Sequence, residues 1–471
     1  MLPPGFRFGV ATAGFQVEGG YNRPGGPRNN WHDWEAAGRV EPSGTALDFW
    51  HRYEDHLDRA VAAGCDGFRL SVEWARCEPA DGEVDTTALD HYAAILDACR
   101  ARGLQPLVTL HHFTHPHWLG DRFWTTVDAP ERFAGWVRTA VAHLGDRCRH
   151  WVTVNEPNVL AVQTWLSGTF PPGKVLSVGD CVRTLDHLLA GHVLAYDVIH
   201  GADPGAVVST NTYSLSVYEL DRLLVDVLLA RRHGVARADL RPWLLERRAE
   251  HEGRVEPYVR RARLREAALR LWAKAALPLE QALPRAVAAV YDSPSACTLD
   301  VAQLDFYAPV TAGHLRLPFA ATSGPRSALP ARMLWDDAPD PAAFAAWTGW
   351  AADAGLPAWV AENGMCNRVR DGRSYARMDG WTRDRYLRTH LAAVVGLLDA
   401  GVPVGSYYHW TLADNYEWGS YEPRFGLYGV DRERGGRWSD RDSMGVDAAG
   451  TLRRLADGLR AGDRSVLLAR R

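Results

Sequence analysis

The sequence predicts an α/β protein whose eight strands close into a (β/α)8 TIM barrel, formed as a single domain over residues 1–471. Eight short apolar or β-branched segments recur along the chain, separated by helix-like or loop segments. Strands that alternate with helices indicate a parallel sheet, and eight such units indicate a closed barrel rather than an open sheet. The sequence shows neither an internal repeat nor a linker that would divide it into separate domains.

The predicted strands are short and evenly distributed along the chain. They cover residues 6–11, 67–72, 106–112, 151–156, 206–213, 302–309, 358–363 and 405–412. Amphipathic patterns between them predict helices, of which the clearest cover residues 51–64, 88–103 and 384–401. Each of these three patterns reaches a glycine at its end, the residue that most often stops a helix.

Two stretches fit the barrel pattern less well. Residues 219–300 are rich in arginine and predict a helical elaboration within the domain, with a helical pattern over 256–277. Its charged surface is interpreted either as the solvated face of a long crossover or as an amphipathic helix that meets a partner or a membrane surface. Residues 313–345 are rich in proline, alanine and serine, which predicts a long loop over the barrel mouth.

The composition excludes several classes of protein. A net charge of −4 shows no basic excess, so we expect no nucleic-acid partner. The N-terminus lacks the signal-peptide pattern, and no apolar run is long enough to span a membrane. The seven cysteines are scattered and odd in number, which indicates reduced thiols in a cytoplasmic protein. The sequence leaves open whether the chain forms a homo-oligomer.

Polar or aromatic residues follow the apolar part of most predicted strands. These residues are Arg69, His112, Asn155, Glu156, Asn211, Tyr307, Glu362, Asn363 and Trp410. In a (β/α)8 barrel the carboxyl ends of the strands surround one mouth, where active sites lie. The nineteen tryptophans are interpreted either as core packing or as platforms on which sugar rings stack.

Two carboxylates at the ends of separate strands are the strongest chemical feature. Pro157 is expected to hold the preceding Glu156 in an extended backbone conformation. Glu362 is followed by Asn363 and Gly364, which allow a sharp turn directly after it. Because glycoside hydrolysis requires a pair of carboxyl groups around the scissile bond, this pattern indicates a glycosidase.

Four motifs resemble those of glycoside hydrolase family 1, the β-glucosidase and β-galactosidase family. TVNEP (153–157) is similar to the acid/base motif of that family, and AENG (361–364) is similar to its nucleophile motif. FRFGVATAGFQVEGG (6–20) resembles its first strand, and HWTLADNYEW (409–418) resembles its last. The matching motifs run in the family's order from residue 6 to about residue 430, and residues 219–300 match least well.

The resemblance implies a role for each matching residue. Glu156 corresponds to the general acid/base, Glu362 to the nucleophile, and Asn155 to the residue that holds the sugar 2-hydroxyl. The resemblance also implies that Arg69 and Tyr307 hydrogen-bond the nucleophile. The remaining substrate-binding residues that it implies are Gln16, His112, Glu417, Trp418 and, as the platform under the sugar ring, Trp410.

These roles predict the direction in which the pKa of each catalytic carboxyl group is shifted. Arg69 and Tyr307 are expected to lower the pKa of Glu362, and the charge of Glu362 is expected to raise the pKa of Glu156. For a mechanism that retains the anomeric configuration, the two carboxyl groups should lie about 5–5.5 Å apart.

The chain departs from the family pattern at positions that bear on the choice of leaving group. Phe113 and Asn158 stand where the family usually has tryptophan, and Thr114 stands where aspartate is common. Asp305 replaces the usual asparagine two residues before Tyr307. The loop that follows Trp418 is short.

The histidines of HHFTHPH (111–117) could suggest zinc, but their spacing is not that of a usual ligand set. We therefore expect no metal and no other cofactor.

The favoured hypothesis is a retaining β-glycosidase, of β-glucosidase type, that acts on a small β-glycoside and also accepts galactosides or fucosides. A transglycosylase with the same intermediate is the second hypothesis. A catalytically inactive sugar-binding protein is the third, although such a protein would be expected to lose one of the two carboxylates. A phosphosugar glycosidase is disfavoured, because Glu417 would repel a 6-phosphate.

Overall fold

The computed structural model describes most of the chain: residues 1–259, 263–276, 283–310, 338–353, 355–370, 373–432 and 435–468. The loop predicted over residues 313–345 therefore lies largely outside the described residues. At its end the prediction is wrong, because helix α13 (Pro341–Ala352) begins there. Asp340 caps this helix by accepting hydrogen bonds from the amides of Ala342 and Ala343.

Eight strands form a closed barrel in the order β1-β10-β7-β6-β5-β4-β3-β2, which confirms the predicted fold class. Their bounds are β1 Arg7–Ala11, β2 Gly67–Ser71, β3 Gln105–Thr109, β4 His150–Asn155, β5 Val207–Leu215, β6 Ala302–Val310, β7 Ala358–Asn363 and β10 Val404–Trp410. Each predicted strand is confirmed to within two residues at either end, except for the C-terminal end of β3. There the predicted run extends past the last strand residue.

Helices and short hairpins fill the connections. The helices are α1 Gly14–Val17, α2 His32–Ala36, α3 Phe49–Ala62, α4 Trp74–Cys77, α5 Thr86–Ala101, α6 Ala129–Leu144, α7 Pro157–Trp165, α8 Val178–Ala202, α9 Arg222–Leu229, α10 Leu240–Val259, α11 Arg263–Ala276, α12 Pro284–Asp292, α13, α14 Arg383–Asp399 and α15 Ala448–Arg460. Two hairpins pair β8 (Arg368–Arg370) with β9 (Arg373–Tyr375) and β11 (Val430–Asp431) with β12 (Arg437–Trp438).

The predicted helix stops are also confirmed. Gly64, Gly103 and Gly401 follow α3, α5 and α14 with positive φ angles of 82°, 72° and 82°. A residue with a Cβ adopts this left-handed conformation only at a cost, so glycine ends these helices.

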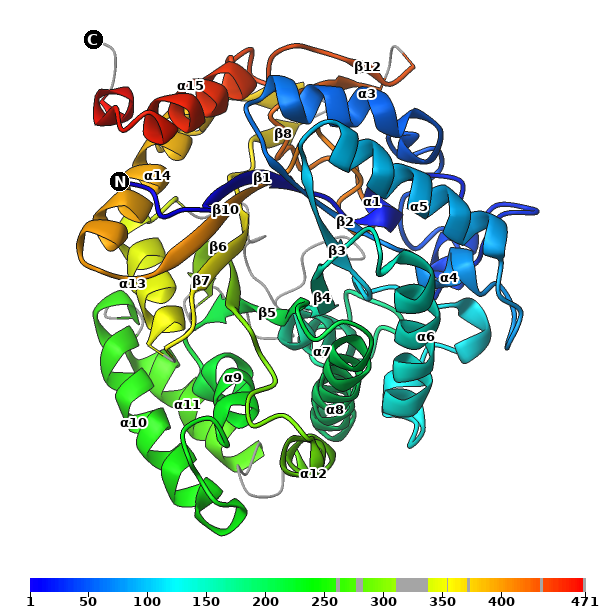
Figure 1. Cartoon of the computed structure of the whole chain (residues 1–471), viewed down its shortest axis with the longest axis vertical. Helices are drawn as coiled ribbons and strands as arrows, with labels where there is room; N and C mark the ends of the chain where they lie inside the picture. The colour runs from blue at the N-terminus through cyan, green and yellow to red at the C-terminus, as the bar shows by residue number, and fades with distance from the viewer. Residues whose placement is uncertain are drawn as a thin grey trace. The chain divides into compact units, whose positions relative to one another are not determined.

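The chain forms two compact units, of which the first contains Met1–Pro116, Ala302–Ala308 and Leu334–Arg471. In this unit β6, β7, β10, β1, β2 and β3 pair in parallel, and α3 and α5 lie side by side (Figure 1). The strands are buried almost throughout, as expected for a parallel sheet covered on both faces.

Two glycines of the first unit make room for one large side chain. The ring of Tyr408 on β10 lies across β1 and reaches β2, so that a Cβ at Gly9 or at Gly67 would overlap with it. Tyr408 is only 2% exposed. The glycines at these positions are thus required by packing.

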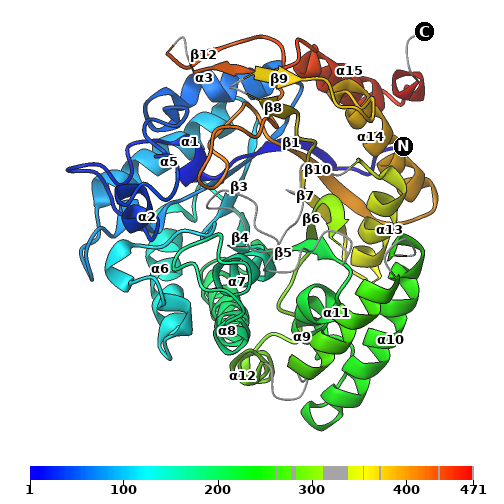
Figure 2. The same ribbon diagram turned by 180° about the vertical axis from the view of Figure 1, so that it is seen from behind.

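The second unit contains His117–Val301 and Pro309–Met333. Within it β4 and β5 pair in parallel, and the long helix α8 packs against α6, α7 and α12 (Figure 2). Asp186 on α8 accepts hydrogen bonds from the amides of Arg285 and Ala286, which ties α8 to the first turn of α12.

The arginine-rich section lies in the second unit, and only part of its charge is solvated. The carboxylate of Asp226 on α9 is buried and binds Arg222, Arg247 and the hydroxyl of Tyr218. The helical pattern over 256–277 corresponds to the end of α10 followed by α11. The interpretation as a solvated charged face is therefore wrong for this buried cluster.

Two further expectations concern the whole chain. All seven cysteines are free thiols, and only Cys297 is partly exposed, in agreement with reduced core residues. Among the described helices, none combines the length and the apolar character that a membrane span requires.

Candidate active site

The first unit holds Glu362, the predicted nucleophile, in a defined orientation. Glu362 lies near the end of β7 and is 3% exposed. Its Oε1 accepts a hydrogen bond from Nη1 of Arg69 over 2.6 Å, and its Oε2 accepts one from the hydroxyl of Tyr307 over 2.6 Å. The two donors come from β2 and β6, as the sequence analysis predicted, and both carboxylate oxygens are engaged.

Arg69 is itself held in place. Its Nε donates to Oγ1 of Thr109, the last residue of β3, over 3.0 Å, and the side chain is fully buried. Arginine presents its donors in a planar, rigid fork, so a second fixed contact determines where Nη1 points. Thr109 was missed by the sequence analysis, although a hydroxyl that ends an apolar strand is a usable signal.

The sequence analysis predicted a lower pKa for Glu362. This prediction is wrong for the net shift, which is upward. Burial raises the pKa of Glu362 above its usual value, while the charge of Arg69 and the hydrogen bonds from Tyr307 and Arg69 act to lower it. The two donors therefore stabilise the ionised carboxylate as expected, but desolvation is the larger effect.

A second carboxylate of the same unit lies among the predicted sugar-binding residues. Glu417 accepts a hydrogen bond from Nε1 of Trp410 at 3.0 Å and one from Nε2 of Gln16 at 3.1 Å. Gln16 is fully buried on α1, and its Nε2 also donates to the carbonyl of Tyr416. The Oε1 atom of Gln16 makes no hydrogen bond to the described residues, so it can still act as an acceptor.

The surroundings of Glu417 favour its protonated form. Burial raises the pKa of Glu417 to about 8, and the nearby charge of Glu362 contributes to the increase. The hydrogen bonds from Trp410 and Gln16 act in the opposite direction. This carboxyl group can therefore change its charge near neutral pH.

Aromatic rings surround His112 in the same unit. The His112 imidazole stacks on Trp410 at 6.0 Å and on Trp418 at 5.7 Å between ring centroids. Burial lowers the pKa of His112 well below its usual value, and the charge of Arg69 adds to this, so the ring is neutral. A neutral imidazole has both a donor and an acceptor nitrogen, as a ligand of sugar hydroxyls requires.

Glu156, the predicted acid/base, lies in the second unit between β4 and α7. Its backbone is left-handed, with φ 39° and ψ 64°, so the predicted extended conformation is wrong. Pro157 disfavours the right-handed helical region for Glu156, and it begins α7 directly afterwards. Left-handed backbone is costly for a glutamate, and such residues concentrate at functional sites.

Phe113 and Trp418 in the first unit also have positive φ angles, of 65° and 43°. Each is adjacent to a residue with a predicted sugar-binding role, namely His112 and Glu417, and Trp418 itself has such a role.

Asn155, which precedes Glu156, is fixed by a neighbour on β5. Nδ2 of Asn211 donates to Oδ1 of Asn155 over 2.9 Å, and both side chains are fully buried. This pairing fixes which end of the Asn155 amide is the acceptor. The sequence analysis placed Asn211 at a strand end but assigned it no partner.

Asn158 and Asp305 are two of the departures from the family pattern, and both are fully buried. The Asn158 amide donates to the carbonyls of Tyr213 and Leu220 and accepts from the amide of Tyr213. These bonds replace a bulky ring with a polar link between α7 and the end of β5.

The histidines of residues 111–117 divide into two groups with different contacts. The rings of His111 and His115 stack on each other, while the ring of His112 contacts the tryptophans.

Comparison with known proteins identifies the family. A family profile described as glycosyl hydrolase family 1 matches residues 1–237 and 349–444, which is more than half of the chain. The chain belongs to glycosyl hydrolase family 1. It is therefore a glycoside hydrolase, and the gap between the matched segments contains most of the arginine-rich section, as the motif comparison had indicated.

Two relatives span nearly the whole length of this family 1 member at modest identity. Beta-glucosidase 6 of Oryza sativa subsp. japonica is 27% identical over 464 residues, which cover 91% of this chain and 86% of that protein. The bifunctional beta-D-glucosidase/beta-D-fucosidase of Bifidobacterium breve is 27% identical over 462 residues, covering 92% and 94%. A 6-phospho-beta-galactosidase of Lacticaseibacillus rhamnosus is 40% identical, but only over 178 residues, or 37% of each chain.

Solved structures agree with the family fold. The beta-glucosidase from Thermotoga maritima in complex with azafagomine superposes with a TM-score of 0.71 at 21% identity, covering 98% of both chains. The AHE enzyme from Alicyclobacillus herbarius gives a TM-score of 0.72 at 22% identity over the same share of both chains. At this level of identity the similarity establishes the fold alone.

Proposed function

We propose that this family 1 hydrolase is a retaining β-glycosidase that cleaves small β-glycosides by double displacement. The observation that carries the proposal is the Glu362 carboxylate, which accepts hydrogen bonds from Arg69 and Tyr307 on separate oxygens at the end of β7. A carboxylate held in this way is oriented for attack. The nucleophile motif of the family supports the assignment.

The proposed reaction has two steps. In the first, Glu362 attacks the anomeric carbon, the glycosidic C–O bond breaks, and Glu156 gives its proton to the leaving oxygen. In the second, water attacks the same carbon, Glu156 takes up a proton from this water, and the ester bond to Glu362 breaks. Each displacement inverts the configuration, so the product retains the β configuration.

The donors and acceptors of the first unit support a hydroxylated sugar ring as the substrate. Gln16 and Glu417 present an amide oxygen and a carboxyl group next to the Trp410 indole, which suits a sugar ring with hydroxyls at C4 and C6. A relative described as a beta-D-glucosidase/beta-D-fucosidase supports a site that tolerates changes at these positions. We propose β-glucosides as the preferred substrates, with β-galactosides and β-fucosides also cleaved.

The decisive experiment is proton NMR of the first product formed from an aryl β-glucoside. A first-formed β-anomer is the expected result, and a first-formed α-anomer would contradict both the mechanism and the role of Glu362.

The same reaction with added methanol tests the alternative of transglycosylation. Methyl β-glucoside as the main product at low methanol concentration would favour the transferase. Above about pH 8, where Glu417 is ionised, a 6-phosphorylated substrate should be cleaved poorly, because the carboxylate would repel its phosphate.

The reduced cysteines support a cytoplasmic location, which we propose on that basis. Fractionation of the native host cells tests it.

A further inference from the structure

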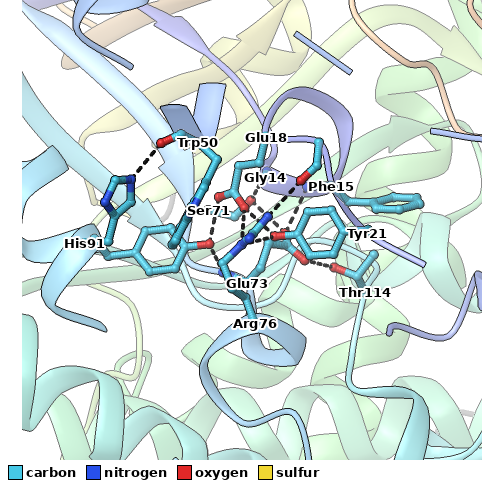
Figure 3. Close-up of polar contacts among 12 residues, drawn as sticks. Gly14, Phe15, Glu18, Tyr21, Trp50, Ser71, Glu73, Arg76, His91 and Thr114 are labelled. Atoms are coloured by element: carbon cyan, nitrogen blue, oxygen red, sulfur yellow. Dashed lines mark hydrogen bonds and ion pairs between the residues drawn. The ribbon is translucent and has the colours of Figure 1, made fainter. Parts of the chain in front are cut away.

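A cluster of buried ionisable side chains lies in the first unit, beside the predicted sugar-binding residues. Glu18, Glu73, Arg76 and Tyr21 point toward one another from separate parts of the chain (Figure 3). Arg76 donates to Glu18 over 3.0 Å and lies over the rings of Tyr21 and Trp50. The cluster therefore contains two carboxyl groups and one guanidinium.

Glu73 is the member of this cluster that has no ion pair with Arg76. It is 2% exposed, and three donors face its carboxyl group. Oε2 accepts from the hydroxyl of Thr114 over 2.6 Å. Oε1 accepts from the hydroxyl of Ser71 at 3.2 Å and from the amide of Phe15 at 3.3 Å (Figure 3).

The contacts of Glu73 lead to two predicted sugar ligands. Phe15 immediately precedes Gln16 on α1, and Thr114 lies two residues after His112. The chain between His112 and Thr114 passes through Phe113 with its φ of 65°, so this short connection has little freedom. One carboxyl group thus joins the segments that carry Gln16 and His112.

The turn that carries Gln16 is packed directly onto Glu73. A Cβ at Gly14 would lie 2.5 Å from Cγ of Glu73, so glycine alone allows this approach. The amide of Gly14 donates to Oγ of Ser71 over 2.5 Å, and Ser71 is the last residue of β2. The helix α1 makes no side-chain cap of its own, and these contacts satisfy amides at its start.

When it is ionised, the carboxyl group of Glu73 only accepts hydrogen bonds, which suits a position that three donors face. Burial raises the pKa of Glu73 to about 7, and the charge of Glu18 adds to the increase. The hydrogen bonds from Thr114, Phe15 and Ser71 act to lower it. The three donors therefore favour the ionised form and bind it most strongly.

We propose that Glu73 is a positioning residue that holds the Gln16 turn and the His112 segment in register with each other, and so sets the geometry of the sugar-binding site. The inference rests on the proposed function, since Gln16 and His112 are sugar ligands only within it. Glu73 makes no contact with the reacting groups described above. It acts through the segments that carry these two ligands.

The experiment is a mutant cycle with a nitrophenyl β-glucoside as substrate. Glu73→Ala should lower kcat/KM about 10- to 100-fold, since small displacements of ligands are costly, while Glu73→Gln should lower it only several-fold. In a background that carries Gln16→Ala and His112→Ala, Glu73→Ala should cost less than about threefold, because its effect passes through these side chains. An undiminished loss in that background would overturn the proposal.

A control variant tests whether a loss of activity could come from lost stability alone. Asp447 caps the outer helix α15 by accepting from the amide of Gly450, and Asp447→Ala destabilises the same unit without touching the cluster. It should leave kcat/KM unchanged at temperatures below unfolding. If Glu73→Ala does not fold, Thr114→Val replaces it, and kcat/KM should then fall in the wild-type background but not in the His112→Ala background. An equal loss in both backgrounds would contradict the proposal.

The outcomes separate this inference from the proposed function. If the wild-type protein cleaves no β-glycoside, or if Gln16→Ala and His112→Ala have no effect, the proposed function or its sugar ligands are wrong. If these two variants lose activity while the Glu73 variants keep the wild-type kcat and KM, the proposed function stands and the positioning role is wrong.

Discussion

Arg69 donates a hydrogen bond from Nη1 to Oε1 of Glu362 over 2.6 Å, and both side chains are almost completely buried. This hydrogen bond links β7, which carries the proposed nucleophile, to β2, although β10 and β1 lie between these two strands in the sheet. Removing one partner of a buried ion pair leaves the other charge without compensation, which typically costs about 3–5 kcal/mol.

We expect Arg69→Met to raise the pKa of Glu362 further, because a positive charge and a hydrogen bond that lower it are lost. The acid limb of the kcat/KM profile should then move to higher pH, since a smaller fraction of Glu362 is ionised at any given pH. A profile measured between about pH 4 and pH 8 checks this. Arg383→Met is the matched control, because Arg383 is equally buried and pairs with Asp442. It should lose stability with an unchanged acid limb, and an identical shift in both variants would contradict the prediction.

Glu362→Gly should lower kcat by roughly three orders of magnitude or more, because the group that forms the covalent intermediate is missing. Azide or formate can occupy the vacated space and should restore cleavage of an activated β-glycoside. With azide the product should be the α-glycosyl azide, since only one displacement occurs. NMR of the azide product decides the outcome. A β-glycosyl azide from this variant would assign the nucleophile to another residue.

Glu156→Ala should depend strongly on the leaving group. A dinitrophenolate needs no proton to depart, so its glycoside should still glycosylate Glu362, whereas an alkyl glycoside should be cleaved very slowly. The covalent intermediate should then accumulate, and added azide should convert it to a β-glycosyl azide. Burst kinetics and mass spectrometry of the intact protein measure this. Equal losses for both leaving groups would argue against an acid role for Glu156.

The sugar specificity should depend on the 2-hydroxyl. Asn155, whose amide is oriented by Asn211, is expected to hold an equatorial hydroxyl at C2 together with Glu362. We expect nitrophenyl β-mannoside, with an axial 2-hydroxyl, to react at least about tenfold more slowly than the β-glucoside, the equivalent of about one lost hydrogen bond. Parallel kcat/KM measurements test this, and equal rates on the two sugars would refute it.

The arginine-rich section should contribute to stability rather than to chemistry. Asp226→Ala leaves the largely buried Arg222 and Arg247 without their shared carboxylate, so the free energy of unfolding should fall by about 3–5 kcal/mol. Turnover of an activated glycoside should be unchanged in the folded protein. Asp239→Ala, at an exposed position of the same section, should change stability by less than about 0.5 kcal/mol. Urea unfolding and initial rates give both quantities, and a lost turnover in folded Asp226→Ala would place this section in the active site.

Much of the fold follows from patterns that are local in sequence. The apolar runs and their spacing predict all eight strands, and Gly64, Gly103 and Gly401 mark helix ends because only a residue without a Cβ adopts their backbone conformation readily. The roles suggested for Gln16, Arg69 and Tyr307 came from motifs, and their hydrogen bonds to Glu417 and Glu362 agree with those motifs.

The sequence by itself determined the strand order along the chain, the family and the two candidate carboxylates, because these depend on residue types at short spacings. Tertiary structure alone decided the left-handed backbone of Glu156 and the net direction of the Glu362 pKa. It also brought Glu73 into contact with Phe15 and Thr114, which are distant from it along the chain. Desolvation and hydrogen bonding depend on which atoms surround a group in space, and for a buried carboxyl group most of those atoms come from other strands.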